Sequence, residues 1–325
     1  MHVTSYAWII TVAVMVTVLA IDVLIIGRRP HEPSMKECGI FIALYVLLAI
    51  VFGFGVWGIS GPQYAGEFFA GWLTEYSLSV DNLFIFIIIM TKMKVPRHLQ
   101  QFALIVGIIL ALIFRGAFIA AGAAAIQSFS WVFFLFGAFL IYTAIKLVIE
   151  YRQGEDPDAE ENLLMRFVKR RFPATDEFHG TRLTKVENGR RLITPMLFVI
   201  VALGSTDLLF ALDSIPAIYG LTQEPYLVFT ANVFALMGLR QLYFLIGGLL
   251  KKLVYLSVGL SVVLAFIGVK LVMHALHEYG VDAAFGLNFE IPIWVSLLVI
   301  IVTLAITTFA SLIKSKNDED LATGG

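Results

Sequence analysis

Nine apolar stretches of the chain are each long enough to cross the hydrocarbon core of a bilayer, which is about 30 Å thick and needs about 20 helical residues. They cover residues 6–27, 39–59, 68–91, 100–125, 130–150, 195–218, 226–250, 253–276 and 291–313. Of the 325 residues 59% are hydrophobic and 14% are charged, against about 45–50% and 25% in soluble domains. Because a segment in lipid must satisfy its own backbone amides, the runs predict helices. The expected fold is an all-α, polytopic membrane helix bundle of about nine transmembrane helices.

The Lys and Arg residues of the loops predict an orientation. Every second loop is basic, and the loops between, near residues 61, 127, 224 and 282, contain no Lys or Arg. Basic loops lie on the cytoplasmic side, so we expect the N-terminus outside and the C-terminus inside. Only four of the 23 Lys and Arg residues fall inside predicted helices: Arg115, Lys146, Arg240 and Lys270.

Two parts of the chain resemble each other. Glu75 and Asp81, followed by Asn82, have the same six-residue spacing as Asp207 and Asp213, followed by Ser214. In each unit an arginine and then a lysine follow the motif, Arg115 and Lys146 in the first and Arg240 and Lys270 in the second, and both lysines begin the tripeptide Lys-Leu-Val. Since a unit of three spans reverses direction, these are predicted to be two inverted three-helix repeats, an arrangement that places a substrate site near the bilayer midplane.

The chain divides accordingly into five parts: two N-terminal helices (1–60), a first repeat (66–150), a cytoplasmic loop (151–192), a second repeat (193–278), and a last helix with its cytoplasmic tail (279–325). Within the loop, residues 162–172 mix apolar and basic side chains, which is typical of a short amphipathic helix on the membrane surface. Topogenic charge alone also explains this composition.

The intramembrane charges indicate an ion site. An ionised side chain at the bilayer centre costs about 2.5–3.5 kcal/mol or more, so these groups must pair, face water or bind an ion. Carboxylate, amide and hydroxyl oxygens suit a hard or borderline divalent cation. The predicted metal-binding residues are Glu75, Asp81, Asn82, Asp207, Asp213 and Ser214, with Arg115, Arg240, Lys146 and Lys270 as intramembrane charge partners.

The six-residue spacing leaves two geometries open. On a straight helix the two carboxylates of a motif lie about 120° apart in azimuth and cannot share an ion. Either the helix breaks between them, or carboxylates of the two repeats converge, with Asp81 and Asp213 meeting on the pseudo-two-fold axis. In a purely structural alternative, Asp81 pairs with Arg115 and Asp213 with Arg240, and the charges only hold the bundle together.

The strings around residues 75–86 and 206–217, with the basic segment that ends at Pro173, closely resemble the TerC family of integral membrane proteins over about residues 35–315. That family includes the pH-responsive Alx proteins, is associated with Mn²⁺ efflux and is similar to LysE-type exporters. The resemblance implies a bacterial inner-membrane location, and it marks Glu75, Asp81, Asn82, Asp207 and Asp213 as ion-site residues.

The function expected from the sequence is export of a divalent metal cation, foremost Mn²⁺, by alternating access, with proton coupling through the carboxylates. Ca²⁺ accepts the same ligands. The expected partners are the lipid bilayer, the cation and protons; no nucleic acid, enzyme activity or permanently bound cofactor is expected. Two alternatives stay open: an exporter of a small organic solute, and a membrane scaffold, metal-supply or insertion factor that does not transport.

Overall fold

Long apolar segments form helices in the computed structural model, which describes residues 3–28, 34–153, 175, 177–187, 190–246, 254–279 and 291–323. The helices are α1 (Ser5–Arg28), α2 (Met35–Ser60), α3 (Pro62–Lys92), α4 (Arg97–Ser128), α5 (Val132–Gln153), α7 (Pro195–Tyr219), α8 (Pro225–Leu236), α9 (Leu239–Ile246), α10 (Leu256–Glu278) and α12 (Ile293–Thr323). Eight spans in the described chain are long and apolar enough to cross a membrane, with α8 and α9 counted as one. The 24-residue α1 comes in addition. The prediction of a polytopic helical membrane bundle is confirmed, while its orientation and its repeats stay predictions.

Proline marks the start of three central helices. Pro62, Pro195 and Pro225 each occupy the first turn of their helix, where the missing N–H costs nothing because that donor has no partner within the helix. Both motif helices, α3 and α7, are continuous, and α7 continues past Pro216. A helix break between the two carboxylates of each motif, which the sequence left open, is therefore absent from these described helices.

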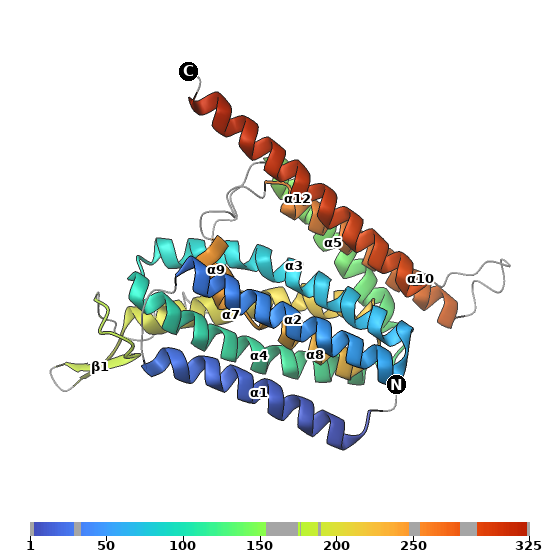
Figure 1. Ribbon diagram of the computed structural model, residues 1–325, viewed down its shortest axis with the longest axis horizontal. Helices are drawn as coiled ribbons and strands as arrows, with labels where there is room; N and C mark the ends of the chain where they lie inside the picture. The colour runs from blue at the N-terminus through green and yellow to red at the C-terminus, as the bar shows by residue number, and fades with distance from the viewer. Residues whose placement is uncertain are drawn as a thin grey trace.

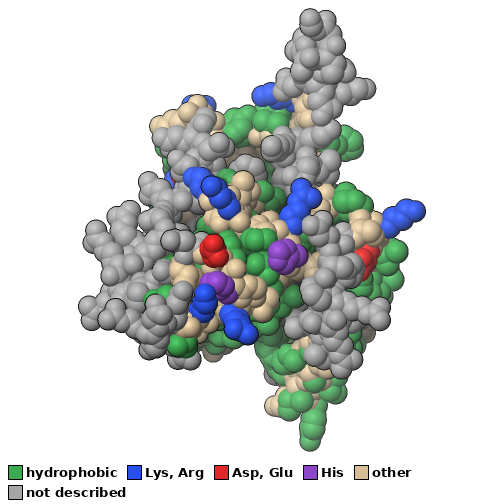
Figure 2. Space-filling view, turned by 90° about the vertical axis from the view of Figure 1, so that its left-hand side faces the viewer, with side chains coloured by type: hydrophobic (Ala, Val, Ile, Leu, Met, Phe, Trp, Pro, Cys, Tyr) green, Lys and Arg blue, Asp and Glu red, His purple; other side chains and the backbone are tan. Residues whose placement is uncertain are grey.

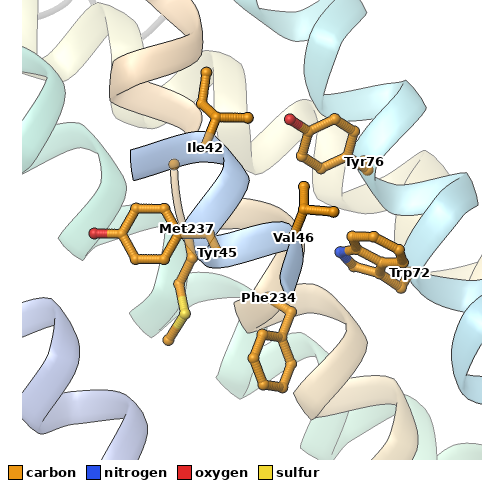
Figure 3. A pocket seen from close by; sticks show the side chains of 8 residues that line it. Ile42, Tyr45, Val46, Trp72, Tyr76, Phe234 and Met237 are labelled. Atoms are coloured by element: carbon orange, nitrogen blue, oxygen red, sulfur yellow. The ribbon is translucent and has the colours of Figure 1, made fainter. Parts of the chain in front are cut away.

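The seventh predicted span, 226–250, is interrupted, although a continuous helix was expected there. Helix α8 ends before Met237, and Gly238 has a φ of +84°, a left-handed conformation that favours glycine. Side chains of α2 and α3 pack around the break: in Figure 3, Tyr45 lies beside Met237, and Trp72 lies on the other side of Val46. A Cβ added to Gly238 would lie 3.0 Å from Cδ2 of Tyr45. The break thus depends on a residue without a side chain.

The helices form two groups that cross at an angle. In Figure 1, α5, α10 and α12 run diagonally across the remaining helices. The most extensive pairings are α5 with α10, α3 with α8, and α4 with α7. The first helix of each predicted repeat therefore packs on the second helix of the other repeat, and the two third helices pack on each other.

A two-stranded antiparallel hairpin, β1 (Thr184–Glu187) and β2 (Arg190–Ile193), adds a small piece of sheet to the expected all-α fold. The sequence between the strands is Asn-Gly, a strong hairpin signal. Figure 2 shows the end of the bundle that carries this hairpin, where Lys and Arg side chains lie among hydrophobic ones. The amphipathic helix predicted at 162–172 lies outside the described residues.

Close contact between α5 and α10 requires glycine. A Cβ added to Gly137 would lie 2.8 Å from the carbonyl oxygen of Gly268, and one added to Gly268 would lie 2.9 Å from that of Gly137. Small residues let helix backbones approach in lipid, where packing rather than the hydrophobic effect holds helices together.

We expect Gly137→Ala to lower the free energy of unfolding by about 1–3 kcal/mol, the usual cost of overpacking. Gly116→Ala on α4 is the matched control, because a Cβ there meets nothing within 4 Å, and it should be neutral or slightly stabilising. Thermal unfolding of the purified variants in detergent would measure both. Equal unfolding temperatures for the two variants would contradict the proposed close contact.

Candidate functional site

The centre of the bundle contains a buried arginine. Arg115 lies near the middle of the apolar helix α4 and is only 1% exposed. Its Nε donates to Oδ2 of Asp207 at 3.2 Å, and its Nη2 donates to Oδ1 of the same carboxylate at 3.0 Å. This bidentate contact between α4 and α7 is the geometry that suits a guanidinium and a carboxylate best.

The remaining donor of the guanidinium reaches three further helical residues. Nη1 donates to Oδ1 of Asn232 on α8 at 2.9 Å and to Oγ of Ser214 on α7 at 3.4 Å. It also forms an ion pair with Oε1 of Glu75 on α3. Four helices therefore converge on one side chain. We call this group of five residues, Glu75, Arg115, Asp207, Ser214 and Asn232, the Arg115 centre.

The Arg115 centre has more negative than positive charge. Its described side chains supply two carboxylates and one guanidinium, which leaves a net charge of −1 when all are ionised. Glu75 is fully buried; its Oε1 pairs with Nη1 of Arg115, and among the described groups its Oε2 has no hydrogen-bond partner. A buried carboxylate with so few partners is costly. The centre is therefore suited to take up a further positive charge.

The structure brings four of the predicted residues together: Glu75, Asp207, Ser214 and Arg115. Asp81 and Asp213 lie in α3 and α7, but their side chains are outside the described part of the structure, so their convergence stays a prediction. Asn82 is buried on α3.

The remaining predicted bases lie elsewhere. Arg240 is buried at the start of α9. Lys146 is exposed on α5, where its Nζ lies 3.4 Å from Oε1 of Glu150. Lys270 of α10 donates from Nζ to Oγ of Ser296 on α12 at 3.2 Å.

The described ion pairs of Arg115 are not those of the structural alternative that the sequence suggested, which stays a prediction because the Asp81 side chain lies outside the described residues. That alternative joined Arg115 to Asp81, the second carboxylate of its own repeat. The described partners of Arg115 are the first carboxylates of both motifs, Glu75 and Asp207. The arginine thus links the two predicted repeats to each other.

Asn232 was not among the predicted site residues. It is 1% exposed, and the one sequence signal for it is an amide side chain within an apolar span. Its Nδ2 has no hydrogen-bond partner among the described groups. In the described part of the chain, no group of three or more His, Cys, Asp or Glu side chains is arranged to hold a metal ion. With the guanidinium in place, the centre offers carboxylate, hydroxyl and amide oxygens, all of them directed at Arg115.

Comparison with known proteins gives a consistent result. The model of the integral membrane protein TerC family matches residues 60–319. An uncharacterized membrane protein of Mycobacterium tuberculosis is 43% identical over 319 residues, which are 96% of this chain and 80% of that protein. A second uncharacterized membrane protein, from Myxococcus xanthus, is 41% identical over 310 residues, 95% and 93% of the two chains. A protein of Escherichia coli named as a proposed membrane-bound redox modulator, Alx, is 34% identical over 290 residues, 86% and 89%. No solved structure matches the chain.

We expect Arg115→Met to destabilise the bundle by about 3–5 kcal/mol, because it leaves Glu75 and Asp207 buried without their counter-charge. Adding Glu75→Gln and Asp207→Asn removes those charges and should recover much of the loss. Lys146→Met is the control, since it removes a base from an exposed pair worth about 0.3–0.5 kcal/mol. Thermal unfolding in detergent would compare the three variants with the parent chain. An Arg115→Met protein as stable as the parent would show that the ion pair does not hold the helices.

Proposed function

This chain belongs to the TerC family of integral membrane proteins, and we propose that it exports a divalent metal cation, with Mn²⁺ as the expected cargo. Transport would proceed by alternating access, in which a central site faces first the cytoplasm and then the outside. The observation that carries this proposal is the composition of the Arg115 centre: two buried carboxylates share one arginine.

The arrangement of the helices supports alternating access. Helix α3 packs on α8, and α7 packs on α4. The first helix of each unit thus packs on the second helix of the other unit, as expected for two three-helix units related by a two-fold axis. Glu75 comes from one unit and Asp207 from the other, so a shift of one unit against the other changes the distance between the two carboxylates. Sites between inverted repeats are used in this way by many transporters.

The guanidinium of Arg115 occupies the place of the cargo in this mechanism. A cation that enters from the cytoplasm would take over the carboxylates of Glu75 and Asp207 and release Arg115 from them. The returning guanidinium, with its bidentate geometry, would then compete with the bound ion and promote its release. Both states pair the carboxylates of Glu75 and Asp207 with a cation, so neither state leaves these two groups buried and unpaired, which would be costly. In the ion-bound state the released guanidinium needs another partner, because a buried arginine is costly as well.

The oxygens of the centre favour hard cations. Beside the two carboxylates, Oγ of Ser214 and Oδ1 of Asn232 face Arg115, and carboxylate and neutral oxygens together suit Mn²⁺, Mg²⁺ and Ca²⁺. Protons are the natural coupling ion in this proposal, because a carboxylate can exchange a metal ion for a proton. An inward proton flow would then accompany cation export.

Two observations bear on other functions. The E. coli relative is named as a proposed redox modulator, but this chain has a single cysteine, Cys38, which is buried, so it cannot form a disulfide within itself. A LysE-like exporter of a small organic solute such as an amino acid would bind the substrate carboxylate through Arg115 or Arg240. Arg115 already has Glu75 and Asp207 as partners, which does not favour that use.

The proposal is tested by metal flux into proteoliposomes that contain the purified protein. We expect Mn²⁺ uptake that depends on the protein and on a proton gradient, and a loss of at least about tenfold in Glu75→Gln and in Asp207→Asn, equivalent to about 1.4 kcal/mol or more. Glu150→Gln is the control, because that carboxylate is exposed at the end of α5. Mg²⁺ and Ca²⁺ measured in parallel would identify the preferred ion. Equal flux in the parent, Glu75→Gln and Asp207→Asn proteins would contradict the mechanism.

A further inference from the structure

A polar cavity of about 590 Å³ lies at the end of the bundle where α7 finishes and α8 begins. Its walls come from the start of α3, residues 219–224, the last turns of α10, and residues 291–293. On the predicted orientation this end faces the outside of the cell. Its polar side chains include Gln63, Glu67, Thr222, Gln223, Glu224, Lys270 and His274.

Hydrogen bonds tie the walls of the cavity together. The carboxylate of Glu67 accepts from the Thr222 hydroxyl at 2.6 Å and from the Gln63 amide at 3.2 Å. The first of these bonds joins α3 to the loop that follows α7. Across the cavity, Gln223 and His274 form a hydrogen bond of 2.7 Å between their Nε2 atoms, which links the same loop to α10.

A buried tyrosine lies between the cavity and the Arg115 centre. Tyr219 is 2% exposed and contributes to the cavity wall. Its hydroxyl donates to the carbonyl oxygen of Ile119 on α4 at 2.6 Å. Ile119 follows Arg115 by one helical turn, which is about 6 Å along the axis toward the cavity. The tyrosine therefore bridges α7 and α4 at a point one turn or more beyond the arginine, on the side of the cavity.

The neighbouring isoleucine closes the other side of α7. Ile218 is completely buried, and its Cγ2 would lie 3.4 Å from a Cβ placed on Gly71 of α3. The Cβ placed on Gly71 would also lie 3.5 Å from the Cβ of Ala231 on α8. Gly71 lies one turn from Glu75, on the side toward the cavity, and Ala231 adjoins Asn232. An apolar layer thus covers the Arg115 centre on the side of α3 and α8 as well.

We propose that Ile218 and Tyr219 form a plug that separates the polar cavity from the Arg115 centre, and that a cation leaving the centre passes this plug into the cavity. The inference rests on the proposed function, because it takes the Arg115 centre as the ion site. In the closed state described by the structure, Ile218 seals against α3 and α8, and Tyr219 seals against α4.

The sequence around the plug explains how it could open. Pro216 has no N–H, so the carbonyl of Leu212 loses its donor within α7 and the helix is weakened one turn before the plug. On α4, Gly122 lies under the tyrosine ring, and a Cβ there would be 2.9 Å from Cε2 of Tyr219. The plug therefore follows a helix position weakened by Pro216 on α7, and its tyrosine ring packs closely against Gly122 on α4. Opening would require the last turn of α7 to move and the bond to Ile119 to break.

Cysteine accessibility tests the plug without any transported ion. The parent chain supplies the background, because its one cysteine, Cys38, is buried. Ser214→Cys reports on the Arg115 centre, and Gln223→Cys, an exposed position on the cavity wall, identifies the face to which the cavity opens. A membrane-impermeant maleimide would be added to intact cells and, separately, to inside-out vesicles.

We expect Gln223→Cys to react from one face and Ser214→Cys to be protected from that face. Adding Tyr219→Ala or Ile218→Ala to Ser214→Cys should raise its rate of labelling from that face by about tenfold or more, because the protecting layer is truncated. Tyr142→Ala is the control, since that tyrosine is 63% exposed on α5, and it should leave the rate unchanged.

Tyr219→Phe keeps the ring and removes only the hydrogen bond to Ile119. This variant therefore tests the plug in the same labelling assay if the alanine variants fail to fold. We expect a smaller increase in labelling, of about threefold or more, from the same face. Rapid labelling of Ser214→Cys in the presence of an intact plug would overturn the proposal, and so would rates that no plug variant changes. If the parent protein transports no metal in the flux assay but the labelling pattern is as expected, the proposed function is contradicted. The plug proposal is then still supported by the labelling.

Discussion

The ion pair between Arg115 and Asp207 is the interaction on which the arrangement of the central helices depends. A guanidinium in the middle of an apolar helix must find its counter-charge inside the bundle, because the alternative is a charge exposed to lipid. Asp207 on α7 accepts two hydrogen bonds from the guanidinium, Glu75 on α3 forms an ion pair with it, and the amide oxygen of Asn232 on α8 accepts a further hydrogen bond. One residue thereby determines which faces of four helices point inward.

The same interaction belongs to a site with one more carboxylate than it has arginines. A structural ion pair needs one carboxylate for each arginine, whereas the described centre has two. The second carboxylate, Glu75, is completely buried, and only one of its two oxygens, Oε1, has a described partner. In the proposed mechanism a divalent cation replaces Arg115 at the centre, and its charge of +2 balances both carboxylates. The polar cavity above Tyr219 gives the released ion a route away from the centre.

Much of this structure follows from patterns that are local in the sequence. The length of the apolar runs predicts the spans. The few charges within them predict Glu75, Asp207 and Arg115 as site residues, because a charged side chain in the membrane is costly unless it has a partner or a function. The repeated motif adds Ser214. The cross-pairing of Arg115 with both motifs depends on helix azimuth and packing, which no local pattern specifies. The break at Gly238 was missed because glycine is also common inside unbroken transmembrane helices, and the hairpin was missed although its Asn-Gly turn is a recognised signal.

The central claim is that the cargo and Arg115 compete for the same carboxylates. A cryo-electron microscopy structure of the purified protein with Mn²⁺, compared with one obtained in the presence of a chelator, tests it most directly. The account predicts metal density between the carboxylates of Glu75 and Asp207, with the guanidinium of Arg115 moved away from Asp207. Metal density elsewhere in the bundle, with both hydrogen bonds from Arg115 to Asp207 intact, would contradict it.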